Sequence, residues 1–483
     1  MGLRTGARHR LSQIYLRSDL IILGLGVMIG AGIFNVAGRQ AHATAGPGVI
    51  LSFMIAGIAA LLAALCFAEL SSTLPTSGSA YTFTYVIFGE VWAWIIGWAL
   101  VLEMELAAAV VARAWSLYAA GTLKGLGITI PEPFAGMVGQ PEGFDLFALF
   151  ILVVLTATVA LGARIGLRAL WFMVIAKLVA IGLVIVVGFK HFNPANIADL
   201  VVPSQTGTVT PDTVLGALTG TTSSFGWFGI FAAAPAITFA YLGFDIVATA
   251  SEEAEDAPRS VPQGMIRSLA IATVLYIAVA VVMVGMVRYD KIDPKTPLPS
   301  AFQTAGEGFM PHVIGLGAVL GLTTVILVLL VGQTRVIFSM ARDGLLPGGL
   351  AEISKGFRTP TKATLFIGAV AIVISQVVPV LTLEQMVVIG TLFAFLFVAA
   401  GTIAMRYTMP DLPRGFRVPM MPVLPVLSIA ATLWLMVNLS IQTWIYFLIW
   451  MAVGLAIYLL YGRKHSILAP EVYTGKRRGR HAR

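Results

Sequence analysis

The stretch LIILGLGVMIGAGIFNV, residues 20–36, decides the fold of this chain. It is apolar enough to enter a membrane, yet it carries glycines at positions 24, 26, 30 and 32. Glycine lets a helix unwind, and inside a membrane unwound backbone is tolerated only where its N–H and C=O groups face protein or a ligand cavity. We therefore expect a broken membrane-spanning helix whose break lines a cavity.

A second apolar segment, residues 228–248, is interrupted in the same way at Leu242-Gly243-Phe244, directly before Asp245. Two broken spans at corresponding places in two halves of a chain are typical of the binding site of a secondary transporter. Gly30 and Gly243 lie 213 residues apart, and each break opens a set of five apolar segments. The pattern predicts an inverted repeat of five plus five helices with helices 1 and 6 broken.

The composition of the chain is that of a membrane protein. Hydrophobic residues make up 58% of the 483 residues and charged residues only 11%, whereas a soluble domain is about 25% charged. We expect an all-α integral membrane protein with twelve transmembrane helices. The expected spans are 19–44 (broken), 48–70, 90–120, 146–163, 168–189, 228–250 (broken), 266–288, 313–341, 363–382, 386–405, 422–438 and 442–461.

These spans divide the chain into six parts. The parts are a cytoplasmic N-terminus (1–18), a first repeat (19–190), an extracellular loop (191–227), a second repeat (228–405), helices 11 and 12 (406–462) and a basic cytoplasmic tail (463–483). Of the 31 lysines and arginines, 23 fall on the side that holds both termini and six on the other side. This bias predicts a multi-pass protein of the cell membrane with both termini in the cytoplasm.

The net charge of +8 follows from the same bias. We expect the basic tail to bind anionic lipid headgroups, and we expect no nucleic-acid partner. The single cysteine, Cys66, and six scattered histidines show no metal-ligand spacing, so we expect no metal and no cofactor.

Backbone groups freed by the two breaks suit the two ends of an α-amino acid. The run 26–34, which includes Gly30 and Ile33, can present N–H groups at the start of a half-helix, where the helix dipole also favours a carboxylate. The stretch 239–243 would present carbonyl oxygens that accept from an ammonium group. The alternative is that the small residues only allow close helix packing.

Four ionisable residues lie inside the expected spans: Glu103, Glu105, Lys177 and Asp245. Each is a candidate functional residue, because an unpaired charge there costs at least about 2.5–3.5 kcal/mol. A desolvated Lys177 can lose and regain its proton during a cycle; the alternative is a fixed charge held by backbone carbonyls. Glu103 and Glu105 point in different directions on a helix, so either can face the cavity, and Asp245 lines the inner cavity or caps a half-helix.

Acidic residues also gather at the cytoplasmic end of the sixth span, at Ser251-Glu252-Glu253 and Glu255-Asp256. We expect them to form salt bridges with arginines of the inner side, in a structural or gating role, with Glu252 as the gating residue.

Several motifs together resemble the amino acid–polyamine–organocation superfamily, and most of all its bacterial cationic amino acid transporter branch. They are GAGIF (30–34), FAEL (67–70), PTSGSAY (75–81), FAYLGFD (239–245), SEE (251–253), PRSVPQG (258–264), the segment from TR (334–335) to MARDGLLP (340–347), and PDLPRGFRVP (410–419). The resemblance covers nearly the whole chain.

The resemblance implies a role for particular residues. The substrate carboxylate would bind N–H groups around Ala31 and Gly32, and the amine would bind carbonyls near Ile29, Phe239, Ala240 and Leu242. Lys177 would replace the sodium ion of related carriers, beside Thr323 and Thr324, which implies proton coupling. Phe239 would be the outer gate, Glu103 and Asp245 would attract a cationic side chain, and the apolar Leu322 would meet the substrate side chain.

We therefore predict a proton-coupled secondary active transporter of amino acids that works by alternating access. Cationic amino acids such as arginine and lysine are the leading class, with small neutral ones such as alanine as a further class. The alternative within transport is an amino acid or polyamine exchanger without net proton coupling. The predicted partners are the amino acid, protons, membrane lipids and a small single-span membrane protein.

Other functional classes find little support in the sequence. An integral-membrane enzyme would need a paired nucleophile and base, which no span shows. A channel would leave the carrier motifs unexplained and would need a filter-like motif. An amino acid sensor would need a signalling domain.

Overall fold

A computed structural model describes residues 15–30, 32–140, 143–162, 167–206, 213–220, 223–354, 356, 359–378 and 380–467. These residues form helices joined by short loops, as expected for an all-α protein. The one departure among them is a pair of two-residue strands, β1 (Gln205–Thr206) and β2 (Ser223–Ser224), which pair antiparallel in the loop predicted at 191–227.

The longer helices follow the predicted spans. They are α1 (Arg17–Met28), α3 (Val49–Thr73), α5 (Glu90–Gly125), α6 (Leu146–Ala160), α7 (Leu167–Lys190), α9 (Gly226–Thr238), α11 (Ala257–Met286), α13 (Met310–Arg342), α14 (Thr361–Val377), α15 (Val380–Thr408), α16 (Val423–Val437) and α17 (Ile441–Ile457). Short elements continue or connect them: η2 (Gly32–Val36), α2 (Ala37–Gln40), η3 (Ala41–Ala45), α4 (Ala80–Phe88), α8 (Val214–Thr219), η7 (Phe239–Tyr241), α10 (Ile246–Thr249), η8 (Ser251–Glu253), α12 (Pro297–Thr304) and α18 (Arg463–His465).

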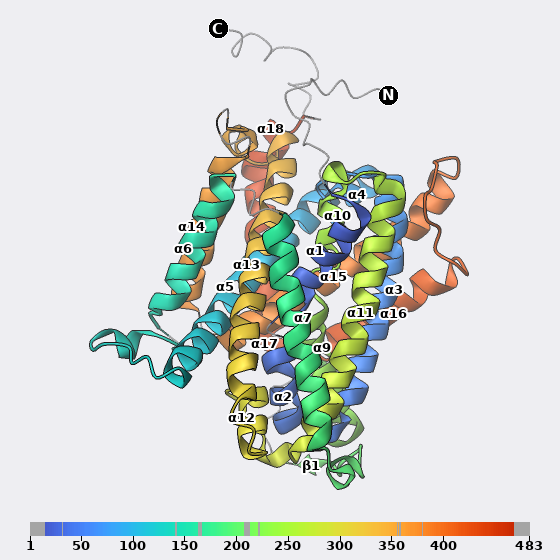
Figure 1. The fold of residues 1–483 in the computed structure, drawn as a ribbon. Coiled ribbons are helices and arrows are strands. Elements are labelled where there is room, and N and C mark those ends of the chain that lie inside the picture. The colour runs from blue at the N-terminus through green and yellow to red at the C-terminus, as the bar shows by residue number, and fades with distance from the viewer. Residues whose placement is uncertain are drawn as a thin grey trace.

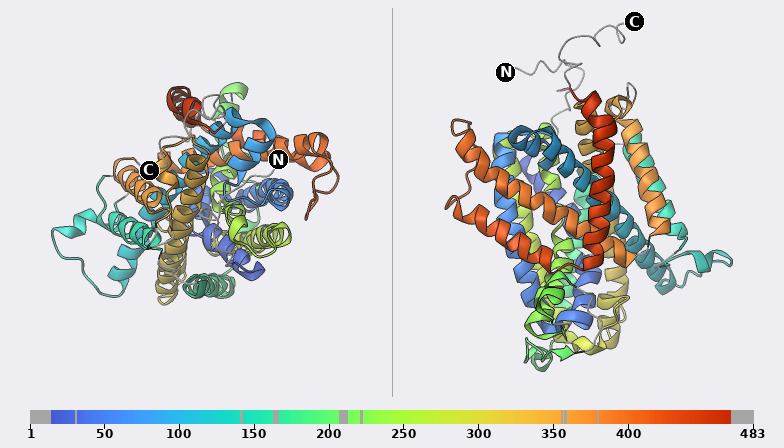
Figure 2. Two further views of the ribbon diagram at one scale, coloured as in Figure 1. Left: turned by 90° about the horizontal axis from the view of Figure 1, so that it is seen from above. Right: turned by 180° about the vertical axis from the view of Figure 1, so that it is seen from behind.

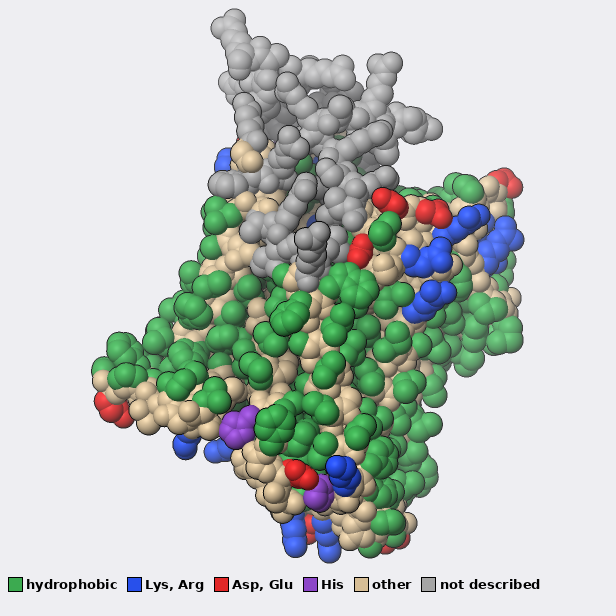
Figure 3. All heavy atoms as spheres, in the orientation of Figure 1, with side chains coloured by type: hydrophobic (Ala, Val, Ile, Leu, Met, Phe, Trp, Pro, Cys, Tyr) green, Lys and Arg blue, Asp and Glu red, His purple; other side chains and the backbone are tan. Residues whose placement is uncertain are grey.

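Eight segments of the described chain are long and apolar enough to cross a membrane, and three further apolar helices, α6, α14 and α16, are shorter. The first of the eight, Arg17–Thr73, contains both of the first two predicted spans. On the face shown in Figure 3, hydrophobic side chains cover the middle of the molecule, and charged side chains gather toward its two ends. This distribution fits a surface that faces lipid between two aqueous layers.

Most helices run along one common direction, with α5 tilted across the bundle (Figure 1). Helix α5 packs along α13 and α15, α3 packs along α11, and α1 packs on α11 and α13. Helices α6 and α14 lie together at one edge, and α16 and α17 lie on the side seen from behind in Figure 2. The two interrupted segments, α1–η2 and α9–η7–α10, therefore have packed helices around them.

Both ends of the described chain lie where α13 finishes. The Tyr15 N–H donates to the Glu253 carbonyl at 3.0 Å, and the Ile467 N–H donates to the Asp343 carbonyl at 3.1 Å. Most of the predicted N-terminal part and of the basic tail, residues 1–14 and 468–483, lies outside the described residues.

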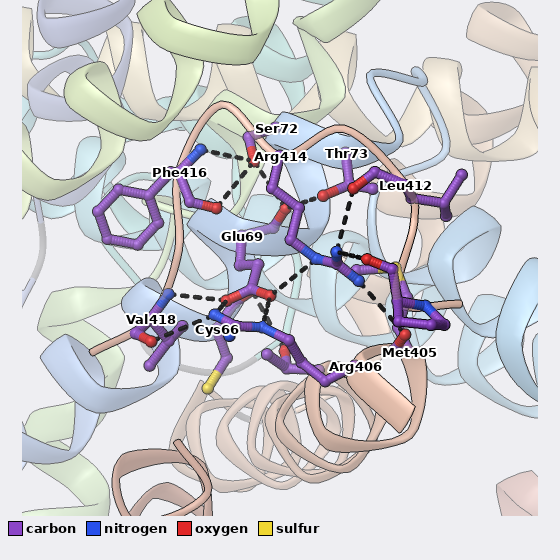
Figure 4. Close-up of polar contacts among 12 residues, drawn as sticks. Cys66, Glu69, Ser72, Thr73, Met405, Arg406, Leu412, Arg414, Phe416 and Val418 are labelled. Carbon is purple, nitrogen blue, oxygen red and sulfur yellow. Dashed lines mark hydrogen bonds and ion pairs between the residues drawn. The ribbon is translucent and has the colours of Figure 1, made fainter. Parts of the chain in front are cut away.

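The loop between α15 and α16 is fixed to α3 by the buried carboxylate of Glu69, which is 0% exposed (Figure 4). Arg406 from α15 donates to both carboxylate oxygens, and Arg414 Nε from the loop lies 3.3 Å from Oε1. The Val418 N–H donates to Oε2 at 2.7 Å. Glu69 thus connects α3 to α15 and to the loop that contains the motif 410–419.

Candidate functional site

The first break lies between α1 and η2. Helix α1 ends at Met28, and Ile29 is extended, with φ −77° and ψ 90°. The helix then resumes at Gly32 with five residues of π-helix. Ala31, which we predicted as a carboxylate ligand, lies outside the described residues.

The second break lies between α9 and α10. Helix α9 ends at Thr238 and tightens into the 3₁₀ turn η7, after which Leu242 is extended with ψ 141°. Gly243 then has a φ of +106°, a conformation that side-chain-bearing residues rarely adopt. Carbonyl groups in this stretch have lost the helical N–H partners that a continuous helix would supply.

The two breaks cross in direct contact. A Cβ atom on Gly32 would lie 2.3 Å from Ala240 Cα, and a Cβ atom on Gly243 would lie 2.1 Å from Val27 Cγ1. Neither position has room for a side chain without moving the other segment. The glycines therefore allow the backbones of the two broken segments to meet at one point.

A pocket with apolar lining opens at this crossing. Its lining residues are Val27, Met28, Gly30, Gly32, Ala107, Val111, Phe239, Leu242, Val325 and Leu329. Four of the predicted binding residues, Gly30, Gly32, Phe239 and Leu242, are among them. Four other predicted binding residues are buried but are not part of the pocket lining: Ile29, Ile33, Ala240 and Leu322.

The sequence did not point to the side chains that close the pocket from α5 and α13. These are Ala107 and Val111 on α5, and Val325 and Leu329 on α13. Each pair is spaced by one helical turn, so each pair shares one helix face. That spacing is the only sequence signal, and it recurs along every apolar helix of the chain.

Lys177, on α7, is fully buried and joins the first break to α13. Its Nζ donates to the Gly26 carbonyl at 2.8 Å, to the Ile29 carbonyl at 2.9 Å and to Thr324 Oγ1 at 3.0 Å. Three acceptors match the three N–H donors of an ammonium group. Among the described residues, no carboxylate lies within ion-pair distance of Lys177.

The two predicted threonines behave differently. Thr324 Oγ1 accepts from Lys177 and lies within hydrogen-bond distance of the Gly321 and Gly26 carbonyls. Thr323 Oγ1 instead accepts from Trp115 Nε1 at 2.9 Å and donates to the Val319 carbonyl at 2.8 Å. The structure therefore brings Thr324, but not Thr323, to the lysine.

The carboxylates of the third and sixth spans lie outside the pocket lining. Glu103 lies beside Asp245 and the Thr391 hydroxyl, whereas Glu105 lies beside Gln333 on α13. One oxygen each of Glu103 and Glu105 has no hydrogen-bond partner. Asp245 accepts from the Gly243 N–H at 3.3 Å. Among the described residues, none of these carboxylates has a lysine or arginine within ion-pair distance.

Acidic residues after the sixth span pair with arginines at the end of α13, as we predicted. Arg335 lies 2.8 Å from Glu253 and also donates to the Thr249 hydroxyl at 3.2 Å. Arg342 lies 3.5 Å from Glu252, the predicted gating residue. Ion pairs thus link α13 to the segment that follows the second break.

The short helix α4, which was not among the predicted spans, is fixed to the same end of α13. The Tyr81 hydroxyl donates to Asp343 Oδ2 at 2.8 Å. Burial raises the pKa of the Asp343 carboxyl, and the hydrogen bond from Tyr81 opposes this rise. Ser77, in the turn before α4, donates to Glu252 through both its N–H and its hydroxyl. Hydrogen bonds therefore hold α4 and the turn before it to Glu252 and to the end of α13.

At the opposite end, a further ion pair was not predicted. Arg39 on α2 donates to both carboxylate oxygens of Glu384, at 2.7 and 2.5 Å. It joins the half-helix beyond the first break to the start of α15. The only sequence signal is a lone charge on each of two otherwise apolar segments.

Taken together, the fold and the crossing define a multi-pass helical membrane protein with two broken helices around a small apolar pocket. The chain belongs to the amino acid permease family, whose family model matches residues 17–464. This match confirms the resemblance to the amino acid–polyamine–organocation superfamily. Families of this kind are membrane transporters.

Several characterised relatives match most of the chain. It is 40% identical over 452 residues to the methylthioribose transporter of Bacillus subtilis (strain 168), with 93% of each chain covered. It is also 40% identical over 455 residues to the branched-chain amino acid permease BcaP of the same organism, again with 93% of each covered. It is 34% identical to human cationic amino acid transporter 4 over 408 residues, 84% of this chain and 61% of that protein.

Proposed function

We propose that this chain is a proton-coupled secondary active transporter of amino acids that works by alternating access around the crossing of its two broken helices. The observation that carries the proposal is the apolar pocket at the crossing, where backbone N–H and C=O groups have lost their helical partners. The N–H groups near Gly32 suit the carboxylate of an amino acid, and carbonyls of the second break suit its ammonium group.

In this proposal, the ion pairs at the two ends of the molecule act as its gates. Arg342–Glu252 and Arg335–Glu253 connect α13 to the segment after the second break, and Arg39–Glu384 connects α2 to α15. In the proposed cycle, these two sets of contacts open in alternation while the crossing keeps the substrate between them. Phe239, which lines the pocket, serves as the outer gate.

The proposed transporter has the topology predicted from the sequence. Twelve membrane spans form a five-plus-five repeat over 19–190 and 228–405, followed by two further helices, with both termini in the cytoplasm. Support comes from the two breaks, from the charge bias of the loops and from the described chain ends, which lie at the same end of the molecule. Lipids surround the chain in the cell membrane, and a small single-span partner stays a prediction.

Lys177 supports coupling to protons. Its ammonium group donates to two carbonyls of the first broken segment and to Thr324, so a change in its protonation alters how that segment is held against α13. No carboxylate within ion-pair distance, among the described residues, fixes the proton on Nζ. If Lys177 stayed charged throughout, the protein would instead be an exchanger that needs counter-substrate.

For the side chain of the substrate, the pocket favours small or branched aliphatic groups. Its side-chain lining is Val27, Met28, Ala107, Val111, Phe239, Leu242, Val325 and Leu329. The branched-chain permease among the relatives agrees with this choice. Cationic amino acids are the second candidate, favoured by the unpaired buried carboxylates of Glu103 and Asp245 next to the second break.

Uptake into proteoliposomes tests the proposal. The purified chain is reconstituted, and the entry of radiolabelled leucine, alanine, arginine and methylthioribose is measured with and without an inward proton gradient, and with and without internal leucine. We expect leucine and alanine to accumulate against their gradient only when protons flow inward. Lys177→Ala should abolish this accumulation, whereas Lys190→Ala, on the same helix but exposed, should preserve it.

The other results separate the alternatives. Uptake that requires internal leucine and ignores the proton gradient would establish exchange. Accumulation of arginine alone would select the cationic class. Accumulation of methylthioribose without any amino acid would overturn the amino acid proposal.

A further inference from the structure

Tyr276, near the middle of α11, contacts both broken helices through one hydroxyl. Its side chain is 0% exposed. The hydroxyl oxygen lies 2.5 Å from the Met28 carbonyl oxygen and 2.8 Å from the Ala240 carbonyl oxygen. Met28 is the last residue of α1, and Ala240 lies in η7, so the hydroxyl lies between the two breaks.

A phenol has a single proton to donate, and here two carbonyl oxygens share it. Met28 is among the last four residues of its helix, whose carbonyls have no intrahelical partner. Ala240 lies in the 3₁₀ turn that ends the helical part of the second segment. The hydroxyl therefore satisfies two carbonyl groups that the breaks have freed, and it keeps both directed at one point.

Neighbouring aromatic rings fix the orientation of the phenol. The Tyr276 ring packs edge-on against Tyr241, with centroids 5.2 Å apart, and lies tilted against Phe53, with centroids 6.0 Å apart. The Tyr241 hydroxyl donates to the Phe53 carbonyl on α3 and touches neither freed carbonyl. Tyr241 is thus a buried tyrosine in the same cluster whose hydroxyl bonds elsewhere.

We propose that Tyr276 is a positioning residue of the transport site, whose hydroxyl holds the carbonyls of Met28 and Ala240 at the spacing that receives the ammonium group of the substrate. Each carbonyl oxygen has two lone pairs, so it can accept from the phenol and from an ammonium group at once. Met28 lines the pocket, and Ala240 lies between Phe239 and Gly32, which both line it. This inference rests on the proposed amino acid transport.

The test compares ligands that differ only at the α-position. Leucine carries an ammonium group there, and 2-hydroxy-4-methylpentanoate carries a hydroxyl; both have the same carboxylate and side chain. Dissociation constants for the two probes are measured by calorimetry on the purified full-length protein and on Tyr276→Phe, which removes only the hydroxyl. We expect the dissociation constant for leucine to rise about tenfold and that for the hydroxy acid to change less than about twofold.

Tyr241→Phe is the matched control, and it should leave the ratio of the two dissociation constants unchanged. An equal loss for both probes in Tyr276→Phe would show a general effect on the pocket and would overturn the inference, as would unchanged leucine binding. If Tyr276→Phe does not fold, Phe53→Leu takes its place, because it loosens the ring that orients the phenol; it should weaken leucine selectively, and unselective weakening would overturn the inference.

Binding by the wild-type protein separates a failure of the proposed function from a failure of the proposed role of Tyr276. If it binds none of leucine, alanine and arginine, the proposed function fails, and the role of Tyr276 fails with it. If it binds leucine and Tyr276→Phe binds leucine equally well, only the role of Tyr276 fails.

Discussion

Lys177 and Glu69 are both charged side chains with 0% exposure, but they are surrounded by opposite kinds of partners. Lys177 donates to two backbone carbonyls and a threonine hydroxyl, all of them neutral. Glu69 is paired with Arg406 and Arg414 and also accepts from the Val418 N–H. One charge is held without a counter-charge, and the other has two.

The difference lies in the partners: Lys177 contacts only neutral groups, whereas Glu69 forms ion pairs. A buried ion without a counter-ion carries a desolvation cost that neutral hydrogen bonds offset only in part, so the neutral form competes with it. The carboxylate of Glu69 is attracted by two guanidinium groups, and removing it leaves both arginines without this ion-pair partner. Lys177 therefore suits a step of the proposed cycle, and Glu69 attaches the 409–422 loop to α3.

The largest expected effect is the loss of stability when Glu69 is removed. Glu69→Ala should lower the free energy of unfolding by about 3–5 kcal/mol, because Arg406 and Arg414 lose their shared partner. Thermal unfolding in detergent measures this loss. As a control, Glu352→Gln removes an ion pair whose side chains are 63–65% exposed and should leave the unfolding temperature nearly unchanged. A Glu69→Ala protein as stable as the wild type would remove the distinction between the two charges.

Lys177→Ala should instead lower uptake strongly and stability only slightly. We expect gradient-driven uptake to fall roughly a hundredfold, because three hydrogen bonds at about 1 kcal/mol each no longer hold the first break to α13. The unfolding temperature should fall much less than in Glu69→Ala, since no buried counter-charge is left unpaired. Parallel uptake and unfolding measurements on both variants check the crossed pattern. If Lys177→Ala loses stability as Glu69→Ala does, the lysine is a structural charge.

The neighbouring threonines give the smallest and most selective test. Thr324→Val keeps the shape of the side chain but removes an acceptor of Lys177, and it should lower the initial uptake rate about fivefold. Thr323→Val removes the partner of Trp115 and should leave uptake close to that of the wild type. Initial rates at several external pH values measure both. Equal losses in the two variants would contradict a specific contact with Lys177.

Much of this arrangement could be predicted from the sequence, because its signals are local. Glycines inside apolar segments placed both breaks, and a lone charge in an apolar run singled out Lys177. The run of acidic residues after the sixth span predicted its pairing with arginines, which the structure finds at Arg335 and Arg342. In each case, the composition of a short window carries the information.

The contacts between distant segments could not be predicted in this way. Glu69 and Arg406 are 337 residues apart, and Arg39 and Glu384 are 345 apart, so no spacing rule joins them. Thr323 and Thr324 were predicted together, but adjacent helical residues point in different directions and only Thr324 faces Lys177. Tyr276 carried no signal, because one tyrosine in an apolar helix has many ordinary packing roles.

The pocket also has a consequence for how such a protein can acquire new preferences. At the crossing, the carbonyl groups belong to the main chain, and no substitution removes a main-chain carbonyl, although proline removes an N–H. The side chains of Val111, Val325 and Leu329, in contrast, come from helices outside the two breaks. In the proposed transport site, the main-chain carbonyls and this part of the side-chain lining lie in separate segments, so we expect substitutions on α5 and α13 to change substrate choice while the crossing stays intact.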